Sequence, residues 1–317
     1  MRTLEISRWL FALADERDAW AKGFDDGQWR AVDVPHDWSV EQEFSAEFSS
    51  GTGYLPGGIG WYRAHVPLDE RSPLRELGSI DGRRVRLVFH GVYKNAQVWA
   101  NGYHLGGRPS GYAQFSFDLT ELLSYAGDDE LVISVRVDHT DISDSRWYNG
   151  SDITRRVELE VHEPVRVGEP GTTITTLVGD DAGAAVQLAR VVINDGVAPV
   201  TVRVDDELRS ASGRLHSSTT LVDVAPGASV ETSVIVLVPD PELWSDVSPN
   251  LYRLSTRLTW QHDGEERVAT YEELAGIRTF RFDPNSGFSI NGEPRILKGV
   301  CLHEDAGTFG TAVPIDV

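Results

Sequence analysis

The chain has 317 residues, a formal net charge of −20 and 40% hydrophobic residues, so it is long enough for more than one folded core. This acidic balance disfavours nucleic acid and anionic membranes as partners. No run of about eighteen apolar residues predicts a transmembrane helix, and the N-terminal residues lack the apolar stretch of a signal peptide. Cys301 is the single cysteine, which excludes an internal disulfide and is typical of a cytoplasmic protein.

The basic residues are nearly all arginine, because Lys22, Lys94 and Lys298 are the only lysines. This composition is typical of proteins from salt-loving or GC-rich organisms. A soluble acidic surface with no halophilic adaptation explains it equally well, and both interpretations stay open.

The first half of the chain predicts many short strands and almost no helix. Apolar residues alternate with period two over residues 85–89 and 131–137, so each run presents one face to a core. Asn101-Gly102 predicts a type I′ hairpin turn, and the spacing from Asp118 to Glu121 predicts a short capped helical turn. These features together favour a β-sandwich or jelly roll.

The second half predicts an immunoglobulin-like sandwich. Its composition shifts to Pro, Gly and Glu over Pro164–Gly171, which we interpret as a linker. Hairpin turns are expected at Asn194–Gly196 and at Asp263-Gly264. Seven strands at regular spacing follow the linker, at 172–178, 185–193, 200–204, 219–224, 230–238, 252–260 and 267–274.

The C-terminal stretch combines a hairpin signal with a polar cluster. Asn291-Gly292 predicts a tight turn, and the apolar run Arg295–Val300 after it predicts a buried strand. This run leads into His303-Glu304-Asp305, as expected for a strand that delivers polar side chains to a site. Cys301 is expected to be a buried, small apolar residue rather than a nucleophile.

Six motifs in order resemble glycoside hydrolase family 2, which contains β-galactosidases, β-glucuronidases and β-mannosidases. The motifs are Val34-Pro35-His36-Asp37-Trp38, Gly57-Gly58-Ile59-Gly60-Trp61-Tyr62-Arg63, Gly91-Val92-Tyr93 through Val98-Trp99-Ala100-Asn101-Gly102 with Gly111-Tyr112, Ser145-Arg146-Trp147-Tyr148-Asn149-Gly150-Ser151, Pro241-Glu242-Leu243-Trp244-Ser245 with Pro249-Asn250-Leu251-Tyr252, and Gly276-Ile277-Arg278. One departure is Asp152, where the family usually has glycine; a turn position there would require the left-handed conformation, which Asp tolerates less well.

The resemblance implies three domains. Residues 1–166 would form a sugar-binding jelly roll, residues 167–278 an immunoglobulin-like sandwich, and residues 279–317 the first strand of a truncated (β/α)8 barrel. The fold class is therefore expected to be all-β, followed by the start of the catalytic barrel.

The resemblance also implies a retaining hydrolase of terminal β-glycosides, β-galactosidase-like, acting through a covalent glycosyl-enzyme. Such enzymes need two carboxyl groups about 5 Å apart. The family places an Asn-Glu acid/base and a second glutamate far along the barrel, and this chain contains no Asn-Glu dipeptide. We therefore assign no catalytic residue and expect the 317-residue chain itself to be inactive.

Substrate contacts are expected from two places. His303 follows the first barrel strand, where active sites of this fold lie, and the family's matching histidine contacts sugar hydroxyls; Glu304 and Asp305 share its loop and could instead cap a helix or orient His303. The jelly roll would add Asp138, Arg146, Trp147 and Asn149, with core packing an equal alternative for Trp147.

A non-catalytic carbohydrate-binding or assembly module is the alternative function, because both catalytic carboxylates are lacking. The residues show no metal-ligand spacing. No cofactor is expected in this chain, although the resemblance allows a divalent cation such as Mg²⁺ in the intact enzyme. The expected partner is a terminal β-glycoside, with a homo-oligomer also allowed; the sequence leaves open which sugar is recognised.

Overall fold

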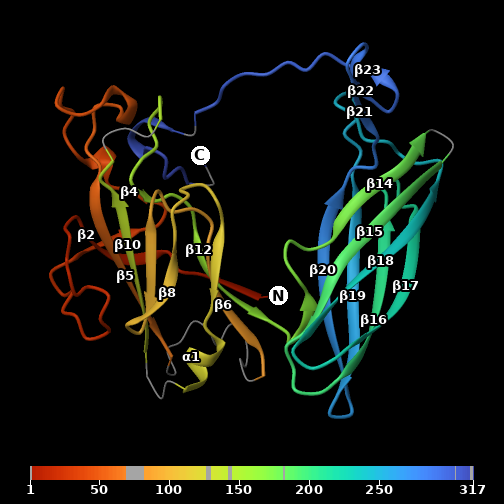
Figure 1. The fold of residues 1–317 in the computed structure, drawn as a ribbon, viewed down its shortest axis with the longest axis horizontal. Helices are drawn as coiled ribbons and strands as arrows, with labels where there is room; N and C mark the ends of the chain where they lie inside the picture. Colours follow the sequence, from red (N-terminus) through yellow and green to blue (C-terminus); the bar gives the residue numbers. More distant parts are fainter. Residues whose placement is uncertain are drawn as a thin grey trace. The chain divides into compact units, whose positions relative to one another are not determined.

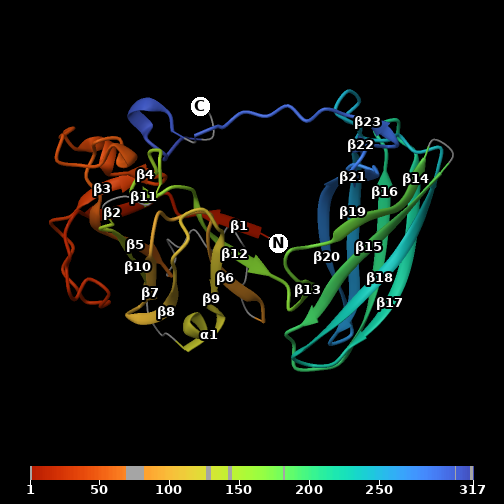
Figure 2. The same ribbon diagram turned by 45° about the horizontal axis from the view of Figure 1, so that its top comes forward.

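The computed structural model describes residues 2–68, 82–125, 130–141, 145–180, 183–303, 305–314 and 317. It forms two compact units, and nearly all of their regular structure is β-strand (Figures 1 and 2). One unit combines Arg2–Val161 with the C-terminal segment Cys301–Val317, and the other is His162–Val300. No helix among these residues is long and apolar enough to cross a membrane.

The first unit is a sandwich of two antiparallel sheets, with the order β3-β2-β5-β10-β7-β8 in one and β1-β12-β6-β9 in the other. The first sheet comprises β2 (Arg8–Ala12), β3 (Arg30–Asp33), β5 (Gly58–Pro67), β7 (Ala96–Ala100), β8 (Tyr103–Arg108) and β10 (Glu130–His139). The second comprises β1 (Arg2–Glu5), β6 (Arg84–Phe89), β9 (Phe115–Asp118) and β12 (Val157–His162).

The alternating residues of both sheets build one core, which is why the sequence pattern predicted this sandwich correctly. Val85, Leu87 and Phe89 of β6 are buried together with the apolar residues of β10. The Asn101-Gly102 turn joins β7 to β8 with positive φ at both residues, as predicted. The predicted helical turn is α1 (Thr120–Tyr125), where the Asp118 carboxylate accepts the Thr120 N–H at 2.8 Å.

A two-stranded pair lies at one end of this sandwich. Its strands are β4 (His36–Asp37) and β11 (Asp152–Ile153), and Asp37 stands directly opposite Asp152. The short 3₁₀ helices of this unit are η1 (Ser39–Glu41), η2 (Ser50–Thr52) and, in the C-terminal segment, η4 (Gly307–Phe309). These short elements place the end of the chain beside β4 and β11 (Figure 2).

The second unit contains all seven predicted strands, in two sheets. One sheet has the order β13-β15-β14 with β18 also pairing with β15, and the other has the order β17-β16-β19-β20. The strands are β13 (Val165–Val167), β14 (Thr173–Asp180), β15 (Gly183–Asn194), β16 (Val200–Arg209), β17 (Leu215–Val224), β18 (Ala228–Pro239), β19 (Tyr252–His262) and β20 (Glu265–Ala275). Valines and leucines from both sheets form the core, and Asp263-Gly264 makes the β19–β20 turn as predicted.

Two expectations for this unit are wrong. Pro164–Gly171 is not a simple linker, because Val165 and Val167 are buried in the core and their strand pairs with β15. Asn194–Gly196 does not close a hairpin, because β15 and β16 lie in different sheets. The Asn194 amide instead donates to the Ala198 and Val224 carbonyls and shapes a crossing loop.

A small sheet follows, made of β21 (Phe280–Asp283), β22 (Gly287–Ile290) and β23 (Glu293–Pro294), with the predicted turn at Asn291-Gly292. The expectation of a buried strand at Arg295–Val300 is wrong. Those residues adopt no regular secondary structure, and Ile296 and Val300 are exposed. A strand takes its backbone hydrogen bonds from neighbours. The Arg295 N–H donates to the Phe288 carbonyl of β22 at 2.9 Å, but among the described residues no strand ladder continues along the run.

Candidate functional site

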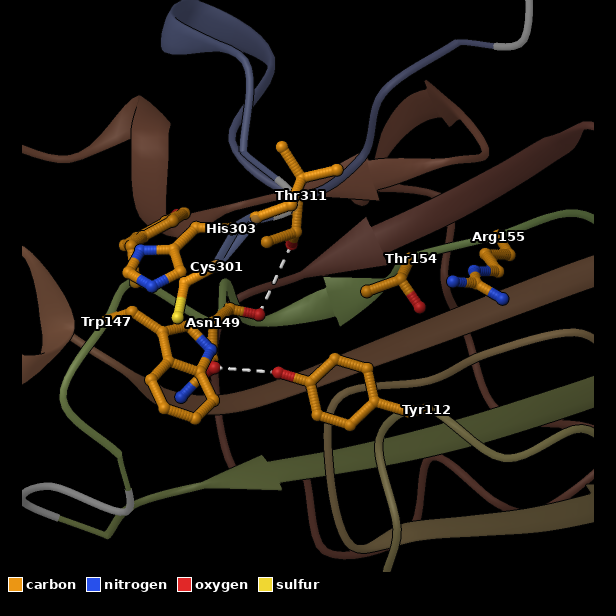
Figure 3. A pocket seen from close by; sticks show the side chains of 10 residues that line it. Tyr112, Trp147, Asn149, Thr154, Arg155, Cys301, His303 and Thr311 are labelled. Carbon is orange, nitrogen blue, oxygen red and sulfur yellow. Dashed lines mark hydrogen bonds between the residues drawn. The ribbon is translucent and has the colours of Figure 1, made fainter. Parts of the chain in front are cut away.

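A pocket lies in the first unit, where the C-terminal segment meets the loop between β10 and β11 (Figure 3). Its volume is about 480 Å³. It is lined by Tyr112, Trp147, Tyr148, Asn149, Thr154, Arg155, Cys301, Leu302, His303 and Thr311. Residues about 150 positions apart in the sequence therefore share one concave surface.

The loop over residues 145–151 holds two of the predicted contacts in fixed positions. The Ser145 hydroxyl donates to the Trp147 carbonyl at 2.7 Å and accepts the Asn149 side-chain amide. The Tyr112 hydroxyl donates to Asn149 Oδ1 at 2.8 Å, as Figure 3 shows. Asn149 is buried apart from its place on the pocket wall, so its amide is preorganised for a polar ligand.

Trp147 and His303 face each other at the pocket. Their ring centroids lie 5.5 Å apart with an interplanar angle of 31°. Trp147 is 41% exposed, so core packing, which the sequence left open for this residue, is wrong. Its indole presents an apolar surface beside an imidazole, a combination that suits the mixed polar and apolar surface of a sugar ring.

The other predicted contacts do not line this pocket. Asp138 binds Arg136 Nη1 at 3.1 Å and the Thr140 hydroxyl at 2.8 Å. Burial would raise the pKa of Asp138, but the hydrogen bonds from Thr140 and Arg136 outweigh it and lower that pKa. Arg146 and Asp305 are exposed outside the lining, and Glu304 lies outside the described residues.

The expectation that Cys301 would be a buried residue of a barrel strand is wrong. Cys301 is exposed and lines the pocket. Besides Cys301, six lining residues were missed as site residues: Tyr112, Tyr148, Thr154, Arg155, Leu302 and Thr311. Tyr112 and Tyr148 lie in the motifs quoted above, so their position in those motifs was a usable signal. Thr311 had none, because its role depends on contacts made across the whole chain.

Two buried carboxylates lie behind the pocket wall. Asp37 and Asp152 are 3% and 0% exposed, and both approach Thr311. Burial raises the pKa of both groups, and the charge of Asp37 raises the pKa of Asp152 further, to well above its ordinary value. The expectation that Asp152 would occupy a strained turn is wrong: it lies in strand β11, and Gly150 adopts the positive φ of +72° instead.

The pocket shows no metal centre. Within the described ranges, no group of three or more His, Cys, Asp or Glu side chains is arranged to hold a metal ion. The side chains present therefore do not fit the divalent cation that the resemblance allows, and we assign no step to a metal.

Comparison with known proteins agrees with the motifs. Residues 166–278 match the family described as glycosyl hydrolases family 2. The β-galactosidase BoGH2A of Bacteroides ovatus is 39% identical over 308 residues, which cover 96% of this chain and 35% of that protein. The β-glucuronidase of Bacteroides fragilis is 26% identical over 306 residues, covering 90% of this chain and 40% of that protein.

Solved structures are similar over almost the whole chain. A glycosyl hydrolase family 2 member from Bacteroides cellulosilyticus has a TM-score of 0.84 at 29% identity, covering 99% of this chain and 40% of that one. A β-glycosidase from Bacteroides vulgatus has a TM-score of 0.81 at 31% identity, covering 99% and 39%. Two consecutive β-sandwiches with these relatives identify the class of protein as the N-terminal portion of glycoside hydrolases. The chain belongs to glycoside hydrolase family 2 as an N-terminal portion, spanning between about a third and two fifths of these relatives' length.

Proposed function

We propose that the pocket at Trp147 and His303 contacts the terminal sugar of a β-glycoside in a retaining, β-galactosidase-like hydrolase. The observation that supports this most is the meeting of Trp147 and Asn149 with His303, since these residues come from separate parts of the chain. Trp147 would pack on the C–H face of the sugar, while Asn149 and His303 would bind its hydroxyls.

Hydrolysis with retention requires a nucleophilic carboxylate and an acid/base carboxyl group about 5 Å apart. Among the residues that the structure describes, no aspartate or glutamate lines this pocket. The chain would therefore bind and orient the sugar, and the carboxyl pair would belong to a catalytic domain outside these residues.

The lack of a carboxylate among the described lining residues also supports a second candidate, a non-catalytic carbohydrate-binding module. One measurement, turnover of a β-glycoside, distinguishes the hydrolase from the binding module. We expect a homogeneous sample of the 317-residue chain to show no turnover of nitrophenyl β-glycosides, and a longer form with a barrel to show turnover. If the longer form binds galactosides but never cleaves them, the binding module is the better description.

The sugar contact itself is tested by binding to the 317-residue chain. We expect Trp147→Ala to weaken binding of a methyl β-glycoside by about 1–1.5 kcal/mol, roughly tenfold in Kd, because it removes the stacking surface. Titrating galactoside, glucuronide and mannoside in turn by NMR identifies the sugar. Trp20→Ala is the matched control, since Trp20 is 39% exposed in the same unit and does not line the pocket. Equal binding by both variants would contradict the proposal.

His303→Ala tests the polar contact. Losing a hydrogen bond to a sugar hydroxyl costs about 1–3 kcal/mol, which corresponds to roughly ten- to a hundredfold in kcat/KM of an active, barrel-containing form. Because His303 is exposed, its replacement should leave the melting temperature nearly unchanged. A structural histidine would do the reverse: stability would fall, and kcat/KM of the folded fraction would stay normal.

A further inference from the structure

The buried carboxylates Asp37 and Asp152 differ sharply in how their charge is compensated. Asp37 accepts hydrogen bonds from the Ser39 N–H at 3.0 Å, the Ser151 N–H at 3.1 Å, the Tyr148 hydroxyl at 2.6 Å and the Thr311 N–H at 3.1 Å, with the Thr311 hydroxyl farther away at 3.4 Å. Asp152 is bonded through Oδ2 to the Thr311 hydroxyl at 2.5 Å, and its buried Oδ1 has no hydrogen-bond partner among the described residues. The environment of Asp37 suits a carboxylate, and that of Asp152 suits a neutral acid.

Their placement makes two charges unfavourable. The two residues are directly opposite partners on β4 and β11, where like charges destabilise a strand pair. A methyl group built on Gly150 would lie 2.7 Å from Asp37 Oδ2 and 2.9 Å from Asp152 Oδ2, so both oxygens flank one point. One proton on the pair removes this repulsion, as it does in other closely spaced carboxyl pairs.

The hydrogen bonds at Thr311 are consistent with that proton on Asp152. The Thr311 hydroxyl has a single hydrogen and three oxygens around it: Asp152 Oδ2 at 2.5 Å, the Asn149 carbonyl at 3.3 Å and Asp37 Oδ2 at 3.4 Å. If Asp152 is neutral, its O–H donates to Thr311 Oγ1, and the Thr311 hydrogen remains for the Asn149 carbonyl. Every oxygen in the short contact then has a hydrogen to share.

Thr311 belongs to the same segment as His303, so this contact affects the pocket. Two glycines let the segment approach the carboxylates: a methyl group on Gly150 would lie 2.0 Å from Thr311 Oγ1, and one on Gly310 would lie 2.1 Å from Asp37 Oδ2. Both glycines have positive φ, which side chains rarely adopt. Thr311 and His303 both line the pocket, so the first holds the segment that presents the second.

We propose that Asp152 is a positioning residue: as a neutral acid it holds Thr311, and with it the segment Cys301–Val317 and His303, at the pocket, and it releases this segment when it loses its proton. This inference rests on the proposed function for its link to sugar binding, although the contact itself does not. The departure from the family's usual glycine at position 152 thus gives this chain a pH-dependent contact.

The direction of the pH effect follows from the surroundings. Burial is the largest cause of the raised pKa of Asp152, and it outweighs the hydrogen bond from Thr311, which lowers that pKa. Release of the segment would expose the carboxyl group to water, so the docked state binds the Asp152 proton more tightly than the released state. Docking is therefore strongest at low pH and is lost as pH rises through that raised value. The other titratable groups that face the pair are Tyr148 and Tyr62, both with raised pKa, then His36 and Glu41 beside Asp37, and His139, which binds Ser151.

The test is hydrogen exchange of the Thr311 N–H in the 317-residue chain between pH 5 and pH 9. Rates are divided by those of an unstructured chain, and the buried Val132 N–H, bound to Asn101 Oδ1 at 2.8 Å, is the reference amide. We expect wild-type protection at Thr311 to fall by up to about tenfold for each pH unit between the pKa of Asp152 in the released state and its raised pKa in the docked state, and to level off above the raised value. Protection at Val132 should stay constant.

Variants of Asp152 and Thr311 test whether the Asp152 proton causes this pH dependence. Asp152→Asn keeps a neutral donor of the same size and should give high protection at every pH, whereas Thr311→Val loses the link and should give low, pH-independent protection. Asp33→Asn, at an exposed aspartate of the same unit, should behave as wild type. Constant wild-type protection, or a wild-type slope in Asp152→Asn or Thr311→Val, would overturn the proposal. His303→Ala should keep the wild-type profile, so a failed sugar-binding role for His303 remains distinguishable from a failed Asp152 contact.

Discussion

Replacing Arg63 by methionine is expected to destabilise the jelly-roll unit by about 3–5 kcal/mol, because it leaves buried partners of a fully buried cation unpaired. The Arg63 side chain is 0% exposed in β5. Its Nε donates to Asp26 Oδ2 at 2.5 Å, and its Nη1 donates to the Ala19 carbonyl at 2.5 Å and the Ser134 hydroxyl at 2.9 Å. One guanidinium thus provides hydrogen-bond donors for buried acceptors in the loop between β2 and β3.

The pKa of Asp26 depends on the same contact with Arg63. Burial would raise the pKa of Asp26, but hydrogen bonds from His65 and Arg63 outweigh it and lower that pKa. The ionised carboxylate therefore contributes stability above the ordinary Asp pKa of about 3.8, and this contribution is lost as pH falls through the lowered value. Arg63→Met should weaken this acid dependence as well as the stability.

Calorimetry measures the effect. A loss of this size corresponds to a fall of roughly 10 °C in the melting temperature of a unit of this length. Arg8→Met is the matched control, because Arg8 is exposed and its nearest carboxylate oxygen, on Asp33, is 3.7 Å away; its expected cost is below about 0.5 kcal/mol. Similar melting temperatures for the two variants would show that the Arg63 contacts contribute little net stability.

Replacing Asp206 by alanine is expected to destabilise the immunoglobulin-like unit by a similar amount, about 3–5 kcal/mol. Asp206 and Arg190 pair inside the sandwich at 2.7 Å, and both side chains are almost fully buried. Asp206 also accepts hydrogen bonds from the hydroxyls of Thr256 at 2.8 Å and Ser218 at 3.3 Å. Without Asp206, the Arg190 charge is left uncompensated in an apolar core.

The double variant Arg190→Met with Asp206→Leu separates the cost of an unpaired charge from the value of the pair. We expect it to recover most of the lost stability, because apolar residues of similar size often replace a buried pair without loss. Asp205→Ala is the matched control, since Asp205 is the next residue in β16 and points to the opposite, outer face. A double variant no more stable than Asp206→Ala would contradict this account.

Together these variants test whether the two units unfold independently. Arg63→Met should lower the transition of the unit that contains Arg2–Val161, and Asp206→Ala that of the unit His162–Val300. If either variant lowers both transitions equally, the chain unfolds as one cooperative block.

The strands and tight turns could be predicted from the sequence because their determinants are local. A period-two apolar pattern specifies which face of a strand is buried, and this was enough to locate all seven strands of the second unit. Asn101-Gly102 and Asn291-Gly292 form the turns expected of them, since both residues accept positive φ. The order of short motifs indicated the family, and it also led to Trp147, Asn149 and His303 as pocket residues.

The tertiary structure alone decided the features that depend on distant partners. Arg295–Val300 has a strand-like sequence but forms no strand among the described residues, because a ladder requires neighbours. Asp37 and Asp152 look like ordinary polar residues in the sequence, and Thr311 lies 274 and 159 positions from them. Their chemistry comes from burial and from the proton that two adjacent carboxyl groups must share, and both conditions arise only when the folded chain brings these residues together.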